Sequence, residues 1–335
     1  MTKQLQFLNS KSLVHILMFG LLSIIVLSSL YLFNFANFGY QIKSSEKDVK
    51  WLLILFSYPH FIASYFWFYK NENLRQENRF VGKLLPLMIV GILVLIFTLQ
   101  VSYLLQAMLI AAWILLFWHF AKQSYGCSVF LAEKNLTHNS KAYLLYSYLS
   151  LAGFGFLNIQ RHESKVLLFK SYVRVFNVPE GFALSLLALS WILFIMFIVS
   201  SIKANQEQSK ADKLKSILVT SIPWIANLMW FSWWAIEGFF VLIPVFHAIQ
   251  YAPFILQGVY KLQADTKKFV KSVLAIFMFS VLFFVGLPFA VNQTLPQISE
   301  ALVTSIFIFF NLHHFFIDSV GWKLSKESIR KILFA

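Results

Sequence analysis

Apolar residues run in long, nearly unbroken stretches along the whole chain and are separated by short polar connections. Each stretch is about 17–25 residues long, which is the length that a helix needs to cross about 30 Å of hydrocarbon. The pattern therefore predicts an all-α fold, a polytopic transmembrane helix bundle with about ten spans. We place the spans near residues 13–35, 51–69, 84–100, 103–121, 142–158, 181–202, 215–234, 238–259, 269–290 and 299–322.

Composition agrees with this class of protein, because 59% of the residues are hydrophobic and only 13% are charged. No polar stretch is long enough for a soluble domain, so we expect a single integral-membrane domain over residues 1–335. Cys127 is the one cysteine of the sequence. It therefore has no partner for an intramolecular disulfide, and a Cys-rich metal cluster is excluded.

The formal net charge of +14 indicates membrane topology and not a nucleic-acid partner. The lysines and arginines are spread through short loops between the spans, as the positive-inside rule describes. A cytoplasmic N-terminus places most of them on the inner side, and ten spans then leave both termini in the cytoplasm. We expect a multi-pass protein in the inner membrane of a bacterium, with the lipid bilayer as its partner.

The connection over residues 159–180 fits this topology least well. It carries four basic residues, Arg161, Lys165, Lys170 and Arg174, although the span count assigns it to the outer side. Two alternatives stay open for it. It is either an amphipathic helix lying in the membrane interface, or a sign that one span has been miscounted.

Polar residues inside the last apolar stretch carry the main functional signal. A charged side chain at the bilayer centre costs about 2.5–3.5 kcal/mol on insertion scales, so an ionisable residue there is a candidate site. Asn311, His314 and Asp318 lie three and four residues apart and therefore share one face of a helix. A carboxylate at Asp318 that accepts from one nitrogen of His314 would leave the other nitrogen to bind a metal.

Three further histidines lie in other predicted spans at comparable depth, and these are His60, His119 and His247. Imidazole is the commonest metal ligand among side chains, and helical bundles build metal sites from facing helices. We therefore predict that His60, His119, His247 and His314 converge on a metal ion. His313 is the weaker fifth candidate, since it is turned about 100° away from His314 on the helix.

The metal is expected to be iron, with copper and zinc as alternatives for a nitrogen-rich ligand set. We assign supporting roles around it to Asp318, Gln250 and Tyr251, the candidate catalytic residues, and to Gln123 beside His119. The remaining histidines, namely His15, His138 and His162, are expected to be interfacial or solvated.

Intramembrane histidines on separate helices, with the adjacent pair His313 and His314 followed by Asp318, resemble the pattern of polyhistidine integral-membrane oxygenases. These families are the bacterioopsin-related carotene-cleaving dioxygenases and, more distantly, the fatty-acid desaturases and hydroxylases. The resemblance reaches His60, His119, His247, His313 and His314. It implies a non-haem iron site and oxygen chemistry on a lipid-soluble small molecule.

Two classes of function remain open at this stage. The first is a metal-dependent oxidoreductase acting on a hydrophobic substrate that enters from the bilayer. The second is a proton-coupled or metal-ion transporter that uses the same histidines and Asp318 as a relay. Polar groups gathered at one depth beside aromatic residues favour the enzyme, because an apolar pocket with a few convergent polar groups is typical of a substrate site.

Overall fold

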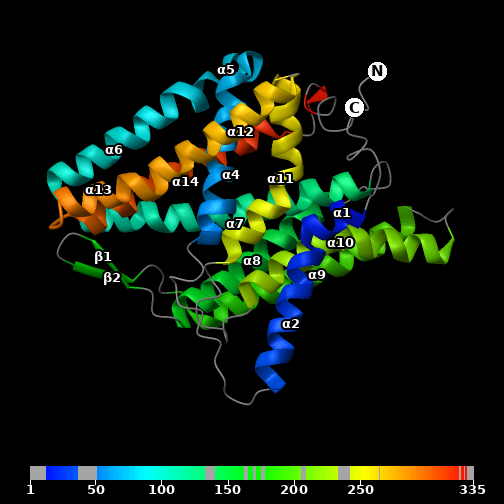
Figure 1. The fold of residues 1–335 in the computed structure, drawn as a ribbon. Coiled ribbons are helices and arrows are strands. Elements are labelled where there is room, and N and C mark those ends of the chain that lie inside the picture. Colours follow the sequence, from blue (N-terminus) through cyan, green and yellow to red (C-terminus); the bar gives the residue numbers. More distant parts are fainter. Residues whose placement is uncertain are drawn as a thin grey trace. The chain divides into compact units, whose positions relative to one another are not determined.

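The structure, a computed structural model of the chain, describes residues 13–36, 51–132, 140–161, 165–168, 171–174, 178–204, 209–232, 242–263, 265–323, 326–327 and 329. Helices lie over each of the ten segments predicted as spans (Figure 1). Their bounds are α1 Leu13–Ile16, α2 Leu22–Ala36, α4 Tyr58–Lys70, α5 Glu72–Glu77, α6 Leu85–Leu99, α7 Ser102–Ala132, α8 Ser140–Arg161, α9 Glu180–Ala204, α10 Lys210–Ser232, α11 Leu242–Gln263, α12 Thr266–Val281, α13 Leu287–Thr294 and α14 Ser299–Gly321.

Six helical stretches among the described residues are long and apolar enough to cross a membrane, which fits an integral membrane protein. They are Phe80–Leu99, Ser102–Leu131, Glu180–Ser200, Leu242–Gln263, Thr266–Thr294 and Ser299–Gly321. Their burial differs widely. In the stretch of α9 only 17% of the apolar window is buried, against 72% in the stretch of α11. A helix in lipid needs no protein cover, so α9 has the character of a lipid-facing helix and α11 that of an internal one.

The helix considered for residues 159–180 is corrected by the structure. Two short strands, β1 Lys165–Leu168 and β2 Ser171–Arg174, pair antiparallel, with Lys165 opposite Arg174 and Leu168 opposite Ser171. Runs containing Val and Tyr on either side of a two-residue connection are typical of a β-hairpin. Short apolar runs fit both the helical period of 3.6 residues and the strand period of two. The sequence pattern therefore could not separate an amphipathic helix from this hairpin.

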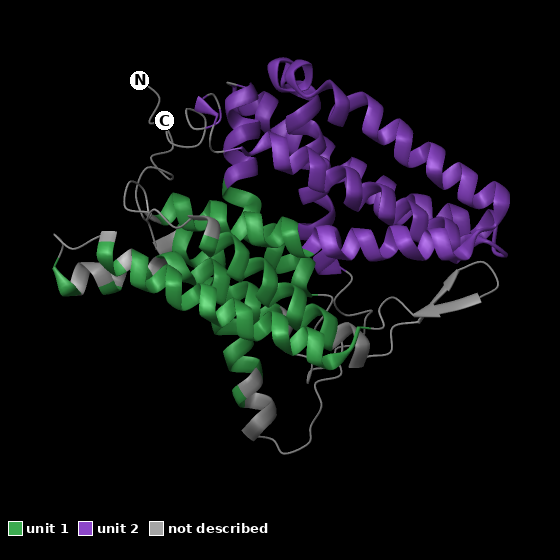
Figure 2. Cartoon of the chain, turned by 180° about the vertical axis from the view of Figure 1, so that it is seen from behind, with its two compact units in different colours: residues 1–50, 117–162, 178–253 green, residues 51–116, 163–177, 254–335 purple. Residues whose placement is uncertain are grey.

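The chain divides into two compact units, coloured separately in Figure 2. Unit 1 consists of residues 1–50, 117–162 and 178–253, and unit 2 of residues 51–116, 163–177 and 254–335. Two of the boundaries fall inside α7 and α11, and each unit is assembled from segments far apart in the sequence. The single membrane domain expected from composition stays a prediction.

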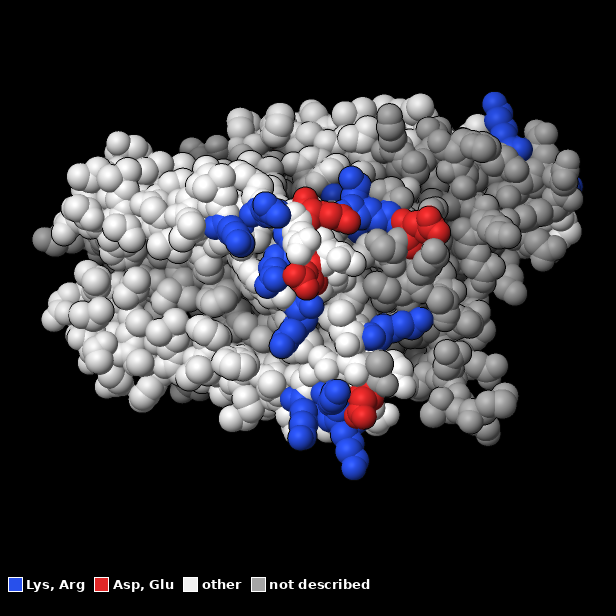
Figure 3. Space-filling view, turned by 90° about the horizontal axis from the view of Figure 1, so that it is seen from above, with Lys and Arg blue, Asp and Glu red and all other residues white. Residues whose placement is uncertain are grey.

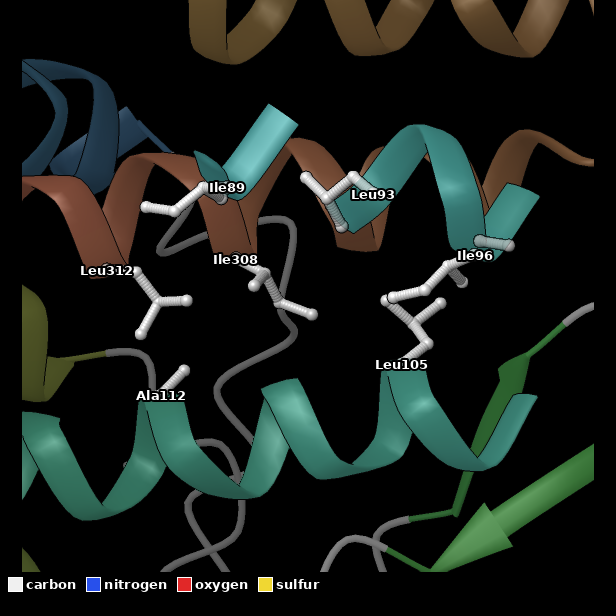
Figure 4. Packing of buried hydrophobic residues seen from close by; sticks show 8 residues of the cluster. Ile89, Leu93, Ile96, Leu105, Ala112, Ile308 and Leu312 are labelled. Carbon is white, nitrogen blue, oxygen red and sulfur yellow. The ribbon is translucent and has the colours of Figure 1, made fainter. Parts of the chain in front are cut away.

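Unit 2 has an aliphatic core between α6, the first half of α7 and α14. Figure 4 shows side chains from the three helices pointing toward one another, among them Leu93, Leu105 and Ile308. These positions recur at helical spacing within each helix, as expected for one buried face. The complete cluster is Ile89, Leu93, Ile96, Leu105, Ala112, Ala301, Ile308 and Leu312.

Four π-helical segments interrupt the described helices, and three of them end two residues before a proline. They are η3 Leu53–Ser57 before Pro59, η4 Phe80–Leu84 before Pro86 and η6 Leu282–Gly286 before Pro288. A proline ring clashes with the carbonyl four residues earlier, and the wider π turn makes room for it. The carbonyl affected by Pro86 is that of Gly82, and it accepts a hydrogen bond from Tyr69 Oη at 2.8 Å.

Charged residues of unit 2 gather at the end of α4, along α5 and at the start of α12. Lys70, Arg75, Lys267 and Lys268 are among them, and Figure 3 views the face on which blue and red side chains collect. The start of α12 is capped by Asp265, whose Oδ1 accepts from the backbone N–H groups of Lys267 and Lys268 at 2.7 and 3.0 Å. Such a charged end is typical of the membrane–water interface.

Candidate metal centre

Two histidines of unit 1 form the first pair. His119 on α7 and His247 on α11 are both buried, and their Nε2 atoms lie 3.1 Å apart. Two imidazole nitrogens bound to one tetrahedral ion at about 2.0–2.1 Å stand roughly 3.4 Å from each other. The separation of this pair is therefore close to that of two ligands of the same ion.

Amide side chains one turn away hold the two helices of this pair together. Gln123 Nε2 donates to the backbone carbonyl of His247 at 3.1 Å and to Gln250 Oε1 at 3.0 Å. Gln250 Nε2 in turn donates to the carbonyl of Phe19 at 2.7 Å. The two glutamines, predicted from the sequence to have supporting roles around the metal, contact each other and the main chain through these bonds.

Two aromatic rings pack beside the His247 ring. Phe120 stacks on it with ring centroids 4.2 Å apart, and Tyr251 lies nearly parallel to it at 6.4 Å with an interplanar angle of 10°. Tyr251, a candidate catalytic residue, is therefore buried in unit 1 beside His247. Trp230 on α10 packs edge-on against Phe120 at 6.1 Å.

Asn227 on α10 belongs to this site and was missed in the sequence. Its Nδ2 donates to the carbonyl of Phe120 at 3.1 Å and also to Ser124 Oγ. Ser124 Oγ donates to the carbonyl of Pro223 at 3.3 Å, so α7 and α10 are joined by buried polar groups. A carboxamide within an apolar segment is a usable signal, since polar side chains in membrane helices commonly hydrogen-bond across helix pairs.

Two histidines of unit 2 form the second pair. His60 on α4 and His314 on α14 are buried, with ring centroids 4.8 Å apart and an interplanar angle of 80°. Asp318 Oδ2 lies 3.4 Å from His314 Nε2, one helical turn further along α14. The predicted proximity of His314 and Asp318 is confirmed.

Aromatic residues also surround the second pair. Phe61 lies against His314 at a centroid distance of 4.4 Å and against Phe284 of η6 at 5.5 Å. Phe284 stacks with Tyr58 at 4.7 Å. The π-helical segment η6 therefore lies in the neighbourhood of this pair, and η3 ends just before Tyr58; π turns are frequent at functional sites.

His313 points to a different partner. Its Nε2 donates to the carbonyl of Val81 in η4 at 2.9 Å, and Tyr65 packs against its ring at 5.2 Å. Because a carbonyl only accepts, Nε2 carries the proton and is engaged with the main chain. His313 thus ties α14 to η4, and its ranking below His314 as a metal ligand stays a prediction.

His15 contradicts the expectation stated for the remaining histidines. His15 was expected to be interfacial or solvated, but it is 1% exposed and packs between Phe19 and Phe130 at 5.7 and 5.2 Å. These two aromatic rings cover the imidazole, which explains the difference. His138 and His162 lie outside the described residues.

Each unit holds two buried histidines that could serve as metal ligands, His119 and His247 in unit 1 and His60 and His314 in unit 2. A set of imidazoles suits zinc, copper and iron alike, so the donor atoms leave the identity of the metal open. The chain matches no protein-family model, no curated protein and no solved structure.

Proposed function

We propose that this protein is a membrane-embedded metalloenzyme whose metal ligands are buried histidines, His119 and His247 in unit 1 and His60 and His314 in unit 2. The observation that carries the proposal is the 3.1 Å separation of His119 Nε2 and His247 Nε2, both buried. Burying polar groups inside a membrane helix costs free energy, so two imidazoles brought together there are a candidate functional site.

Iron is the metal we favour, and the reaction class is oxidation of a lipid-soluble small molecule. A non-haem iron ion with nitrogen ligands supplies oxygen activation, which is a chemistry suited to apolar substrates. The rings of Phe61, Phe120 and Phe284 beside the histidines support an apolar substrate. Copper and zinc remain the alternatives.

The other candidate residues would act on the ligands. Asp318 would hold the His314 ring, Gln250 would fix the segment that carries His247, and Tyr251 would cover the face of His247. Partners of this kind set ligand orientation and basicity in metal sites, and their loss usually costs about 10–100-fold in affinity or activity.

We also propose ten spans, both termini in the cytoplasm and a location in a bacterial inner membrane. Single cysteines at Asn139 and Gln293 should then react with a membrane-impermeant thiol reagent from opposite sides. The native Cys127 is buried and should not react, so the protein without an added cysteine is the control. Labelling of both positions from one side would contradict this topology.

The metal itself is tested by elemental analysis of detergent-purified protein after exposure to iron, copper or zinc. We expect bound metal in stoichiometric amount, with X-ray absorption reporting imidazole nitrogens near 2.0–2.1 Å. Protein that binds none of the three metals would contradict the proposal.

Histidine variants identify the ligands. His60→Ala, His119→Ala, His247→Ala and His314→Ala should each abolish stoichiometric binding. His313→Ala is the matched control, because it removes an imidazole from the next position of α14 that donates to a carbonyl. Full metal content in His314→Ala would remove that residue from the ligand set.

A transporter is the second candidate, favoured by the buried carboxylate of Asp318 beside His314 on a membrane-spanning helix. Intramembrane Asp and His pairs occur in proton relays. Reconstituted vesicles distinguish the two functions. Metal-dependent oxygen consumption with a lipophilic substrate supports the enzyme, whereas proton or metal flux without turnover supports the transporter.

A further inference from the structure

The first helical segment of unit 1 carries a break at Gly20. The residue has φ 155° and ψ −27° and lies within the π-helical segment η2 Leu17–Leu21. A positive φ of this size is open to glycine and strained for other residues. A Cβ at this position would also lie 2.7 Å from Ala226 Cβ and 3.0 Å from the carbonyl oxygen of Ile222. Close packing against α10 and the backbone break thus both require glycine.

At this break two main-chain carbonyls accept hydrogen bonds from side chains. Gly20 O accepts from Ser23 Oγ at 2.8 Å, and Phe19 O accepts from Gln250 Nε2 at 2.7 Å. Both carbonyls belong to the irregular turn of η2, so the turn sets where Phe19 O lies when Gln250 of α11 reaches it. Phe19 and Gln250 are both fully buried.

Gln250 also connects the Phe19 carbonyl to the first histidine pair through hydrogen bonds. Its Oε1 accepts from Gln123 Nε2 at 3.0 Å, and the same Gln123 nitrogen donates to the His247 carbonyl at 3.1 Å. Gln250 lies three residues after His247 on α11, and Gln123 lies four residues after His119 on α7. Both histidine-bearing helices are therefore tied, one turn from their imidazoles, to the carbonyl that the break presents.

We propose that Gly20 is a positioning residue for the metal centre, acting through the hydrogen-bonded chain from Phe19 O to Gln250, Gln123 and the His247 main chain. The proposal rests on the proposed function, since the quantity it concerns is the geometry of two metal ligands. Buried hydrogen bonds in a low dielectric are strong and directional, so this chain fixes how α7 and α11 approach each other. A segment without a ligand of its own thereby controls the distance between His119 Nε2 and His247 Nε2.

The test uses two variants that break the chain at different points. Gln250→Met keeps the length of the side chain and removes both of its bonds, whereas Gly20→Ala displaces the Phe19 carbonyl and leaves Gln250 intact. We expect each variant to bind Co²⁺ about 10–100-fold more weakly than wild type, the usual effect of residues that orient metal ligands. We also expect a changed visible spectrum of the Co²⁺ form, which a purely structural role would not produce.

Matched controls separate positioning from general damage. Gln257→Met removes another buried amide from α11, and Gly126→Ala adds a methyl group in α7 where nothing lies within 4 Å. Both should keep wild-type affinity and spectrum. Ala226→Gly, combined with Gly20→Ala, removes the 2.7 Å contact and should restore part of the affinity.

The outcomes distinguish this proposal from the one on which it rests. Wild-type protein that binds no Co²⁺, Fe²⁺, Cu²⁺ or Zn²⁺ would overturn both. Wild-type protein that binds metal, together with a folded Gln250→Met variant of unchanged affinity and spectrum, would overturn only the positioning role. If Gly20→Ala does not fold, Gln250→Met decides the question by itself.

Discussion

The two units place a pair of histidines by different means. In unit 1 the segments carrying His119 and His247 are joined by amide hydrogen bonds through Gln123 and Gln250. In unit 2 the rings of His60 and His314 stand against aromatic side chains, and Asp318 lies 3.4 Å from His314. The first pair is set by neutral hydrogen bonds between helices and the second by ring packing and one carboxylate.

This difference extends to the way each unit packs. Unit 1 buries a polar seam where α7 and α10 meet, in which Ser124, Ser128 and Asn227 donate to main-chain carbonyls. Unit 2 relies on the aliphatic core of Figure 4 and on stacked tryptophans. Lipid is as apolar as leucine, so hydrogen bonds and close packing, and not the hydrophobic effect, have to hold helices together in either unit.

The largest effect on stability should come from the stacked tryptophans of unit 2. Trp67 is fully buried, stacks on Trp322 at 5.1 Å and donates to the Gly321 carbonyl at 3.3 Å. Trp67→Ala should lower the free energy of unfolding by about 3–5 kcal/mol, as large cavities do. Thermal unfolding in detergent measures it, with the exposed Trp51→Ala as control. Equal stability of the two variants would contradict packing as the main support of unit 2.

The next effect concerns the carboxylate that distinguishes the second pair. Asp318→Asn should keep the fold and lower metal affinity about 10–100-fold, because a neutral amide supports the His314 ring less well. Chelator competition measures the affinity. Glu300→Gln on the same helix is the control, since Glu300 is exposed and lies more than three turns from His314. An unchanged affinity in Asp318→Asn would show that the carboxylate serves another purpose.

A smaller effect is expected in the polar seam of unit 1. Asn227→Leu removes the donor to the Phe120 carbonyl and to Ser124, and should cost about 1 kcal/mol, the scale of hydrogen bonds between membrane helices. Asn311→Leu is matched to it, because Asn311 donates at 2.7 Å to Phe307 within its own helix. Chemical denaturation should separate the two variants. If Asn311→Leu were the less stable, hydrogen bonds between helices would not distinguish unit 1.

The smallest effect is confined to the exposed cap of α12. The backbone N–H groups of Lys268 and Lys267 lower the pKa of Asp265. A carboxylate whose pKa is lower in the folded state contributes stability that is present above its unfolded pKa of about 4 and is lost as the pH falls below it. Asp265→Ala should therefore be slightly less stable than wild type at pH 7, with a smaller difference in acid. Asp265→Asn keeps an acceptor, so its stability should not follow this pH dependence.

Much of the architecture was readable from the pattern of apolar residues. Helices lie over all ten segments that were expected to be spans, because the need to satisfy backbone polar groups in lipid leaves a long apolar segment little choice but a helix. The exception, residues 165–174, has short apolar runs that suit either period, and there pairing with a neighbouring strand decided the outcome.

The four candidate metal ligands could be picked out from the sequence because they are polar residues within apolar segments. His60, His119, His247 and His314 are conspicuous in the sequence because a polar group in hydrocarbon needs a reason, and all four are buried. The helical period separated His314 from His313, and the structure places the second against the Val81 carbonyl.

What only the tertiary structure decided is how these side chains are supported. His15 is as buried as the four candidates, although the sequence predicted it to be interfacial or solvated. The role of Gly20 depends on α10 packing against it and on Gln250 reaching Phe19 from 231 residues away in the chain. Sequence alone therefore determined where the helices lie and which residues are out of place in a membrane, since both follow from local solvation. Partners and distances depend on which helices meet, and that is settled only by packing among segments remote in the chain.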